Sequence, residues 1–240
     1  MNRRATASGA LAAAVSGLVS DRRVADVLTQ LVLDATTVLD AQSVAVLVTV
    51  GEDDLVLLNA SSHEAGQIEL LQAQSWSGPC VDVIASGRRI SVAGEDDLVA
   101  RWGAVGRAMV EAGHSGVDAY PMSWRGRVLG GLNVFRGATG VARSVSHDVG
   151  QAFADVATLL LVHDADVPVE QIRAHVYEAV QARSLVEQAK GVLAHVHAID
   201  PARAYELLLA RAEEGGGLTS VALDVVSERR PQGRNGSSAS

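Results

Sequence analysis

The spacing of hydrophobic residues changes several times along the first 164 residues. Apolar residues recur every three to four positions over 21–40 and over 148–164, which predicts an amphipathic helix at each place. Short apolar or β-branched runs bounded by turn-forming residues predict strands instead. Because strands and helices do not alternate regularly, we expect an antiparallel α+β domain rather than a doubly wound sheet. The expected strands are 43–50, 55–60, 88–92, 117–123 and 127–135, and the expected additional helices are 64–74, a short helix from 79, and 98–113.

From Pro168 onward the strand pattern stops and only helical patterns follow. A long helix is expected over 169–197, and Asp200 with Pro201 should begin the next helix, over 202–214. The glycines at 215–217 should end that helix, and Thr219 can cap a last short one. The predicted organisation is an N-terminal extension (1–19), an α+β domain (20–164), an all-α domain of three helices (165–230) and a disordered tail (231–240).

Charge and cysteine content narrow the classes of partner and compartment. A net charge of −8 argues against broad, non-specific attraction to nucleic acid or to anionic membranes, although a local basic surface is compatible with it. The single cysteine, Cys80, rules out an internal disulfide framework and a cysteine-based zinc cluster. No apolar run approaches the roughly 18 residues of a membrane span. A cytoplasmic location is therefore expected.

The long helix carries a regular apolar stripe with basic interruptions. Its apolar members follow each other in steps of four and three, which usually indicates helix pairing, here most simply a parallel coiled coil between two copies of the chain. Arg183, Lys190 and His197 lie seven residues apart on nearly the same face, and Lys190 is the only lysine. The predicted dimer seam consists of Ile172, Val176, Ala179, Val186 and Leu193.

Two interpretations of the basic positions are open at this point. Arg183 and Lys190 can extend along the margin of the seam, with Arg183 paired to Glu187 one turn later. Alternatively, like charges that face each other across a dimer call for an anionic ligand. Spacing alone slightly favours the first interpretation.

The carboxy-terminal third resembles the ANTAR domain, a small three-helix module of bacterial transcription antiterminators. The matching residues are Gln188-Ala189-Lys190-Gly191 with Val192-Leu193, then Ala204-Tyr205 with Leu208 and Ala212, then Leu218 and Val221-Ala222. The resemblance implies that paired domains bind stem-loops of nascent RNA, so that a terminator does not form. It implies RNA contacts from Arg183, Lys190, Gly191, His197, Arg203, Tyr205 and Arg211, with Tyr205 either stacking on a base or filling the core.

The preceding segment, roughly 20–164, resembles a GAF sensor domain. The resemblance is carried by Gly78-Pro79-Cys80, Gly87, Arg101-Trp102, the 119–122 strand and the 129–135 strand. It implies a small-molecule pocket or a dimerisation scaffold, and no cluster of residues identifies a ligand, so no cofactor is assigned. Cys80 is either a reactive thiol or, more often for such a residue, a small buried hydrophobe. The expected sensor-pocket residues are Trp76, Cys80, Arg101, Trp102 and Asn133.

These observations together predict a non-enzymatic, dimeric, signal-responsive RNA-binding regulator. The seven histidines are scattered, so no metal site is expected, and no catalytic triad is recognisable. A rival from another class is a signalling scaffold whose helical domain docks a protein and no longer binds RNA. The acidic turn Glu213-Glu214 before the glycines supports this rival, because negative charge beside an RNA surface costs affinity.

Overall fold

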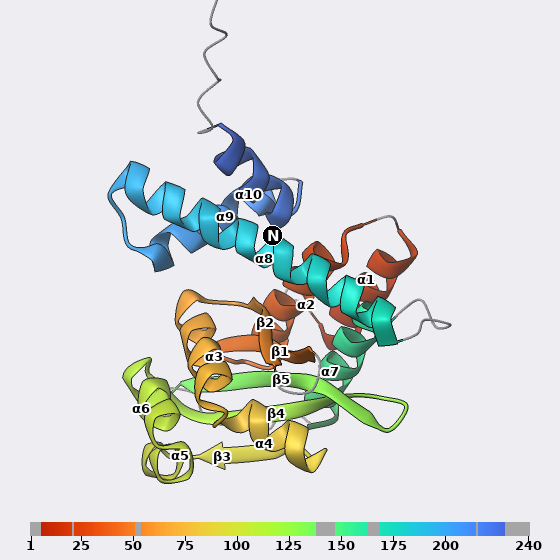
Figure 1. Ribbon diagram of the computed structural model, residues 1–240, viewed down its shortest axis with the longest axis vertical. Helices are drawn as coiled ribbons and strands as arrows, with labels where there is room; N and C mark the ends of the chain where they lie inside the picture. The colour runs from red at the N-terminus through yellow and green to blue at the C-terminus, as the bar shows by residue number, and fades with distance from the viewer. Residues whose placement is uncertain are drawn as a thin grey trace, which may run out of the picture. The chain divides into compact units, whose positions relative to one another are not determined.

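A computed structural model describes residues 6–20, 22–50, 54–137, 147–162, 169–214 and 216–228. The chain divides into two compact units, Met1–Arg183, here the sheet unit, and Ser184–Ser240, here the helical unit. The long helix α8 (Val169–His197) contributes its first half to the sheet unit and its second half to the helical unit (Figure 1). The boundary therefore falls inside this helix, about twenty residues later than the predicted boundary at 164/165.

The sheet unit is built on one five-stranded antiparallel sheet with the strand order β2-β1-β5-β4-β3. Each of the four neighbouring pairs runs antiparallel, which confirms the predicted α+β class and both predicted hairpins. The strands are β1 (Ser43–Val50), β2 (Asp54–Ala60), β3 (Ile90–Ala93), β4 (His114–Trp124) and β5 (Arg127–Gly137).

Both faces of the sheet are covered, and strand β1 shows how one sequence serves both. Val44 and Val46 belong to the hydrophobic cluster on one face, and Ala45 and Leu47, between and beside them, belong to the cluster on the other. This follows from the two-residue period of a strand. Helices α1 (Ala7–Val19), α2 (Val24–Val38) and α7 (His147–Val162) cover the first face, and α3 (His63–Ser75), α4 (Pro79–Ser86), α5 (Glu95–Trp102) and α6 (Ala104–Glu111) cover the second (Figure 1).

Two predicted segments differ from the structure. The N-terminal extension contains α1, which begins after Thr6, whose side chain accepts a hydrogen bond from the Gly9 N–H at 3.2 Å. Ala10 and Ala14 of this helix are buried in the core of the sheet unit, so the helix belongs to that unit. The single helix predicted over 98–113 is two helices, because the backbone turns at Gly103, where φ is +53°, a conformation that favours glycine.

The helical unit packs the end of α8 against α9 (Pro201–Glu213) and α10 (Leu218–Ser227). Asp200 caps α9 by accepting a hydrogen bond from the Arg203 N–H at 2.8 Å, as predicted. Helix α10 is capped by Gly217, whereas Thr219 is buried inside the helix, so the predicted Thr219 cap is wrong. Within the described ranges, no helix combines the length and apolarity that crossing a membrane would require.

Candidate functional site

Lys190 lies in the interior of the helical unit, not on its surface. Only 4% of the residue is exposed. Its Nζ donates to Oε2 of Glu187 at 2.7 Å and lies 5.5 Å from the ring centroid of Tyr205 on α9. A carboxylate and an aromatic face thus enclose the ammonium, which gives it an ion pair and a cation–π contact. The sequence prediction that Lys190 is presented directly to RNA is not met in this conformation.

Tyr205 is a core residue of the helical unit. It is 8% exposed and packs in the cluster that contains Leu193, Leu208 and Ala222. A ring held this way offers no free face for a base, because one face meets Lys190 and the rest of the side chain is packed. The core interpretation of Tyr205 is therefore correct for this structure, and the stacking interpretation is not supported by it.

Four other predicted RNA-binding residues are exposed on the helical unit. Gly191 and His197 lie on α8, and Arg203 and Arg211 lie on α9. The Arg203 guanidinium pairs with Glu206 at 2.5 Å, but both side chains are about 60% exposed, so water screens this pair strongly. A Cβ atom at Gly191 would meet nothing within 4 Å, so its absence leaves open space at the surface.

The predicted dimer seam is buried within one chain. Val176 and Ala179 belong to the hydrophobic core of the sheet unit, and Val186 and Leu193 belong to that of the helical unit. The side chain of Ile172 lies outside the described residues. The seven-residue period is real, but intrachain packing satisfies it. The four seam residues whose side chains are described are therefore covered by the chain's own cores, and the expected pairing of two chains stays a prediction.

Arg183 belongs to the sheet unit rather than to a common stripe with Lys190. Its guanidinium lies 3.3 Å from the point where a Cβ at Gly66 would stand, so it lies against α3. Its positive charge also acts on the buried carboxyl of Glu69, in the same helix. The structure thus splits the predicted basic line: Arg183 contacts the sensor side, Lys190 is enclosed, and His197 is exposed.

A fully buried polar network connects α3, α4 and β5 in the sheet unit. The Asn133 amide donates to Glu69 Oε1 at 2.7 Å, and the Gln72 amide donates to Glu69 Oε2 at 2.8 Å. The other end of Gln72, Oε1, accepts the Cys80 N–H at 3.1 Å. All four residues are completely buried. Two of the predicted sensor residues, Cys80 and Asn133, are therefore brought together through two residues that the sequence did not indicate.

Burial determines the protonation of this network. It raises the pKa of Glu69 to about 8, although the hydrogen bond from Asn133 and the charge of Arg183 oppose the shift. Burial, with the neighbouring Glu69 carboxyl, also raises the pKa of the Cys80 thiol well above its usual range. A buried thiol that resists ionisation is a poor nucleophile, which agrees with Cys80 as a small core residue.

The glycines of the GAF-like motifs make room for the network. A Cβ at Gly78 would overlap the Gln72 amide, and the positive φ of +141° there also favours glycine. A Cβ at Gly131 would stand 3.0 Å from the Cys80 sulfur. Gly78 therefore needs to be glycine, and a side chain at Gly131 would require the Cys80 sulfur to shift by a few tenths of an ångström.

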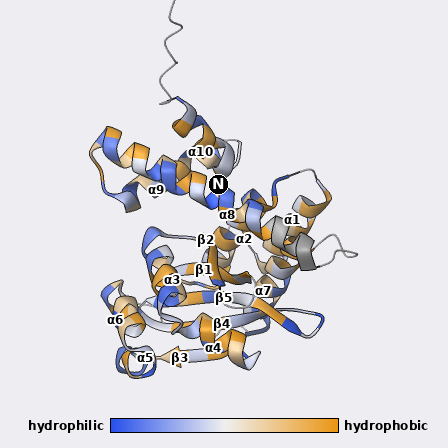
Figure 2. Cartoon of the chain, viewed as in Figure 1, coloured by the Kyte–Doolittle hydropathy of each residue, from blue (hydrophilic) through white to orange (hydrophobic). Residues whose placement is uncertain are grey.

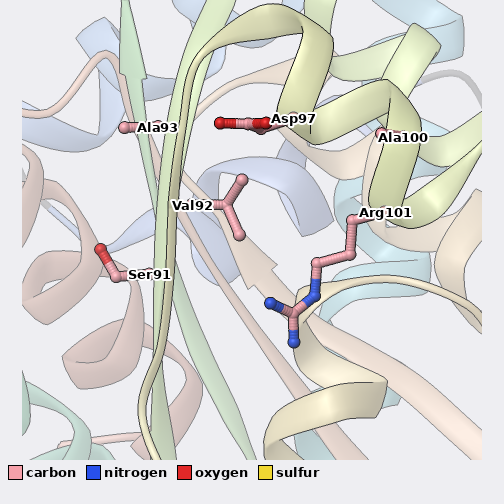
Figure 3. A pocket seen from close by; sticks show the side chains of 6 residues that line it. All are labelled: Ser91, Val92, Ala93, Asp97, Ala100 and Arg101. Atoms are coloured by element: carbon pink, nitrogen blue, oxygen red, sulfur yellow. The ribbon is translucent and has the colours of Figure 1, made fainter.

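The remaining predicted sensor residues lie elsewhere on the sheet unit. Asp82 accepts hydrogen bonds from Arg101 Nε at 2.9 Å and from the Trp102 indole N–H at 3.2 Å. Trp76 is 44% exposed. Arg101 also lines an open pocket of about 460 Å³ between β3 and α5. Helix α5 has an acidic first turn and is coloured largely as hydrophilic in Figure 2. Figure 3 shows its lining side chains: Ser91, Val92, Ala93, Asp97, Ala100 and Arg101. Cys80 and Asn133, being buried, do not open to it.

Sequence reasoning did not place Glu69 in a buried network, and it named Glu187 only as a partner for Arg183, four positions earlier. The structure gives Glu187 an ion pair with Lys190, three positions later. Both spacings lie on one helix face, so sequence alone does not choose between them. Asn133 gave a usable signal, since an amide within an apolar strand requires a buried polar partner.

Comparison with known proteins identifies the carboxy-terminal part. The family model of the ANTAR domain matches residues 174–222. The chain therefore carries an ANTAR domain. ANTAR domains form an RNA-binding class of antitermination modules, so this part of the chain is regulatory in kind. The matched segment begins ten residues before the helical unit, in the half of α8 that packs on the sheet unit. No curated protein matches the chain.

Solved structures show that the part preceding the ANTAR domain has the GAF fold. The GAF domain of an Acinetobacter phosphoenolpyruvate-protein phosphotransferase is similar with a TM-score of 0.51 and 12% identity, covering 66% of this chain and 94% of that one. The A. aeolicus nlh2 GAF domain in an inactive state gives a TM-score of 0.50 and 11% identity, covering 66% and 96%. At this identity the likeness establishes the fold alone.

Proposed function

We propose that this protein is a signal-responsive RNA-binding regulator that prevents transcription termination by binding stem-loops in nascent leader RNA. The observation that carries the proposal is the ANTAR match at 174–222, on a helix that continues from a GAF fold. In this proposal the GAF fold receives the signal and helix α8 transmits it, because one element is packed into both hydrophobic cores.

The exposed residues of α8 and α9 supply the proposed RNA contacts. Arg203 and Arg211 offer guanidinium groups that suit phosphate, and His197 adds a ring that can donate a hydrogen bond. Gly191 lets a nucleotide backbone approach α8 closely, since no side chain occupies that point. With two or three phosphate contacts per chain, the slope of log affinity against log salt should be about −2.

Charge favours a rival proposal, a protein-docking scaffold. Over 184–228 the sequence has three cationic side chains against seven carboxylates, and one of the three cations, Lys190, is enclosed. Three more arginines follow at 229, 230 and 234 and bring the helical unit close to neutrality. A docking module would bind its partner with little dependence on salt, which separates the two proposals.

Crosslinking of RNA in cells, followed by sequencing, tests the proposed function. The full-length protein is compared with an Arg203→Ala/Arg211→Ala variant and with a matched control, Arg107→Ala/Arg127→Ala, which removes the same charge from exposed positions of the sheet unit. We expect enriched stem-loop transcripts with the wild type and the control, and loss of enrichment with the α9 variant. Equal recovery from all three proteins would favour the scaffold. Sedimentation of the same three proteins, with and without RNA, tests whether the chain forms the predicted dimer.

A further inference from the structure

We propose that the outer edge of strand β3 pairs with the same edge of a second copy of the chain, so that the two sheets join across a two-fold axis. This pairing goes beyond the proposed function and does not depend on it. A second copy is the occupant that fits this edge, because the charges at the two ends of β3 complement their own two-fold image.

Strand β3 has one edge without a neighbouring strand. It stands last in the strand order and, in the described part of the sheet, pairs only with β4 (Figure 1). The Gly94 N–H donates to the Ser115 carbonyl of β4 at 2.8 Å, so Gly94 and Val92, two residues earlier, turn their backbone groups toward β4. The N–H and C=O groups of Ser91 and Ala93 therefore face outward, and both residues are exposed. Such a row of groups is a template for another strand.

The surroundings of β3 leave this edge open to a second strand. Its four residues, Ile-Ser-Val-Ala, include no proline and no charge, the residues that commonly block edge pairing. Helix α5 follows at once, but Leu98 and Trp102 pack it in the core cluster that contains Val117 of β4, so it covers the face of the sheet. The pocket of about 460 Å³ between β3 and α5 leaves space beside Val92 (Figure 3).

One antiparallel register uses all the outward-facing groups of β3. In such a pair, an outward-facing residue must stand opposite another outward-facing residue. Within β3, both Ser91 and Ala93 find such a partner only when Ser91 stands opposite Ala93 of the second copy. Both residues of each copy are then hydrogen-bonded across the axis. Val92 faces Val92 of the second copy as a non-hydrogen-bonded pair, with the two Cα atoms roughly 4.5 Å apart.

The same register brings opposite charges together at both ends of β3. It places Arg88 near Asp96 of the second copy, and Arg89 near Glu95 of the second copy, and the two-fold axis repeats each pair. All four residues are exposed, and within one chain they form no ion pair with other described residues. Opposite charges across neighbouring strands stabilise the pairing, whereas like charges destabilise it.

Charge reversal of the full-length chain, followed by sedimentation velocity over a range of concentrations, tests the pairing. Arg88→Glu and Asp96→Arg, each alone, should weaken the dimer about tenfold, because each sets like charges together at two symmetric places. The double variant restores opposite charges and should form a dimer like the wild type. Arg107→Glu, at an exposed position of α6, is the matched control and should also form a dimer like the wild type.

A cysteine at the two-fold axis tests the register. Val92→Cys should form a covalent dimer under mild oxidation, because the expected separation of the two Cα atoms suits a disulfide. Ser91→Cys is the control: it is more exposed, but in this register its Cα lies about 8 Å from that of its counterpart, beyond the reach of a disulfide. The native Cys80 is buried and should not react in either variant.

The outcomes decide whether β3 is the interface. A dimer that either single charge reversal weakens, that the double variant restores and that Val92→Cys crosslinks supports the pairing. A chain that remains monomeric at every concentration refutes it. A dimer that ignores the charge reversals, or that Ser91→Cys crosslinks faster than Val92→Cys, forms through another surface and refutes it as well. If Val92→Cys loses its native circular dichroism, the charge reversals, which alter exposed positions only, give the answer.

Discussion

Replacing Glu69 with glutamine should stabilise the sheet unit, and by an amount that grows with pH. The carboxyl is completely buried, and burial raises its pKa to about 8, whereas the value in an unfolded chain is 4.5. Below pH 4.5 both states hold the proton. Between pH 4.5 and 8 the unfolded chain releases it and the folded protein retains it, so folded stability falls as pH rises. Glutamine removes this dependence and keeps the size of the side chain.

The expected magnitude follows from that interval. Each unit of difference in pKa corresponds to about 1.4 kcal/mol. The free energy of unfolding of the wild type should therefore be about 3 kcal/mol lower at pH 7 than at pH 4. Glu69→Gln should regain most of this difference at pH 7. The Asn133 Oδ1 atom, which has no hydrogen-bond partner among the described residues, can accept from the new amide if Asn133 flips. The network can therefore stay hydrogen-bonded.

Urea denaturation of the full-length chain at pH 5 and at pH 8 measures this effect. Tryptophan fluorescence reports on the sheet unit alone, because Trp76, Trp102 and Trp124 all lie in it. Glu111→Gln, which changes an exposed carboxylate on α6, is the control and should behave like the wild type. If Glu69→Gln changes stability equally at both pH values, Glu69 does not hold its proton in the folded protein. A loss of stability at both would show that Arg183 requires the anion.

Three further outcomes follow from other buried groups. His114 is stacked on Phe135, and burial lowers its pKa to about 4. The free energy of unfolding of the wild type should therefore fall by up to about 3 kcal/mol as the pH falls from 6.5 to 4, because the unfolded chain binds the proton first. His114→Phe should not show this fall in the same urea titration. Gly150→Ala should lower the melting temperature, at a cost of about 2 kcal/mol, because the new Cβ overlaps the Tyr120 ring. The Cys80 thiol should react with a chromogenic disulfide reagent only in urea; rapid reaction in buffer would contradict its burial.

Much of the fold could be predicted because its local signals agree. The β-branched run of β1, the polar turn and the apolar run of β2 all indicate the same hairpin. The break between α5 and α6 could not be predicted, because an isolated glycine within a helical pattern is usually tolerated. Helix α1 was missed because it has few large apolar residues, although Ala10 and Ala14 suffice for close packing.

The sequence singled out several residues around the candidate site, but not the contacts that they make. The seven-residue period of α8 identifies a buried face, and it does not say which surface buries it. Val176 and Leu193 pack in cores of their own chain, so the period alone does not establish a partner helix. Lys190 stood out in the sequence, but its enclosure by Glu187 and Tyr205 depends on how α9 packs on α8, which is a tertiary property.

The ten residues 174–183 belong both to the ANTAR match and to the sheet unit, whose core includes Val176 and Ala179. A fragment cut at residue 174 would leave the sheet unit without Val176 and Ala179, and a fragment cut after 183 would shorten the ANTAR sequence. No single cut in the sequence therefore separates the two modules without shortening one of them. A recombination event that exchanged one of them would have to carry this shared segment along, or find a new sensor with a matching apolar surface.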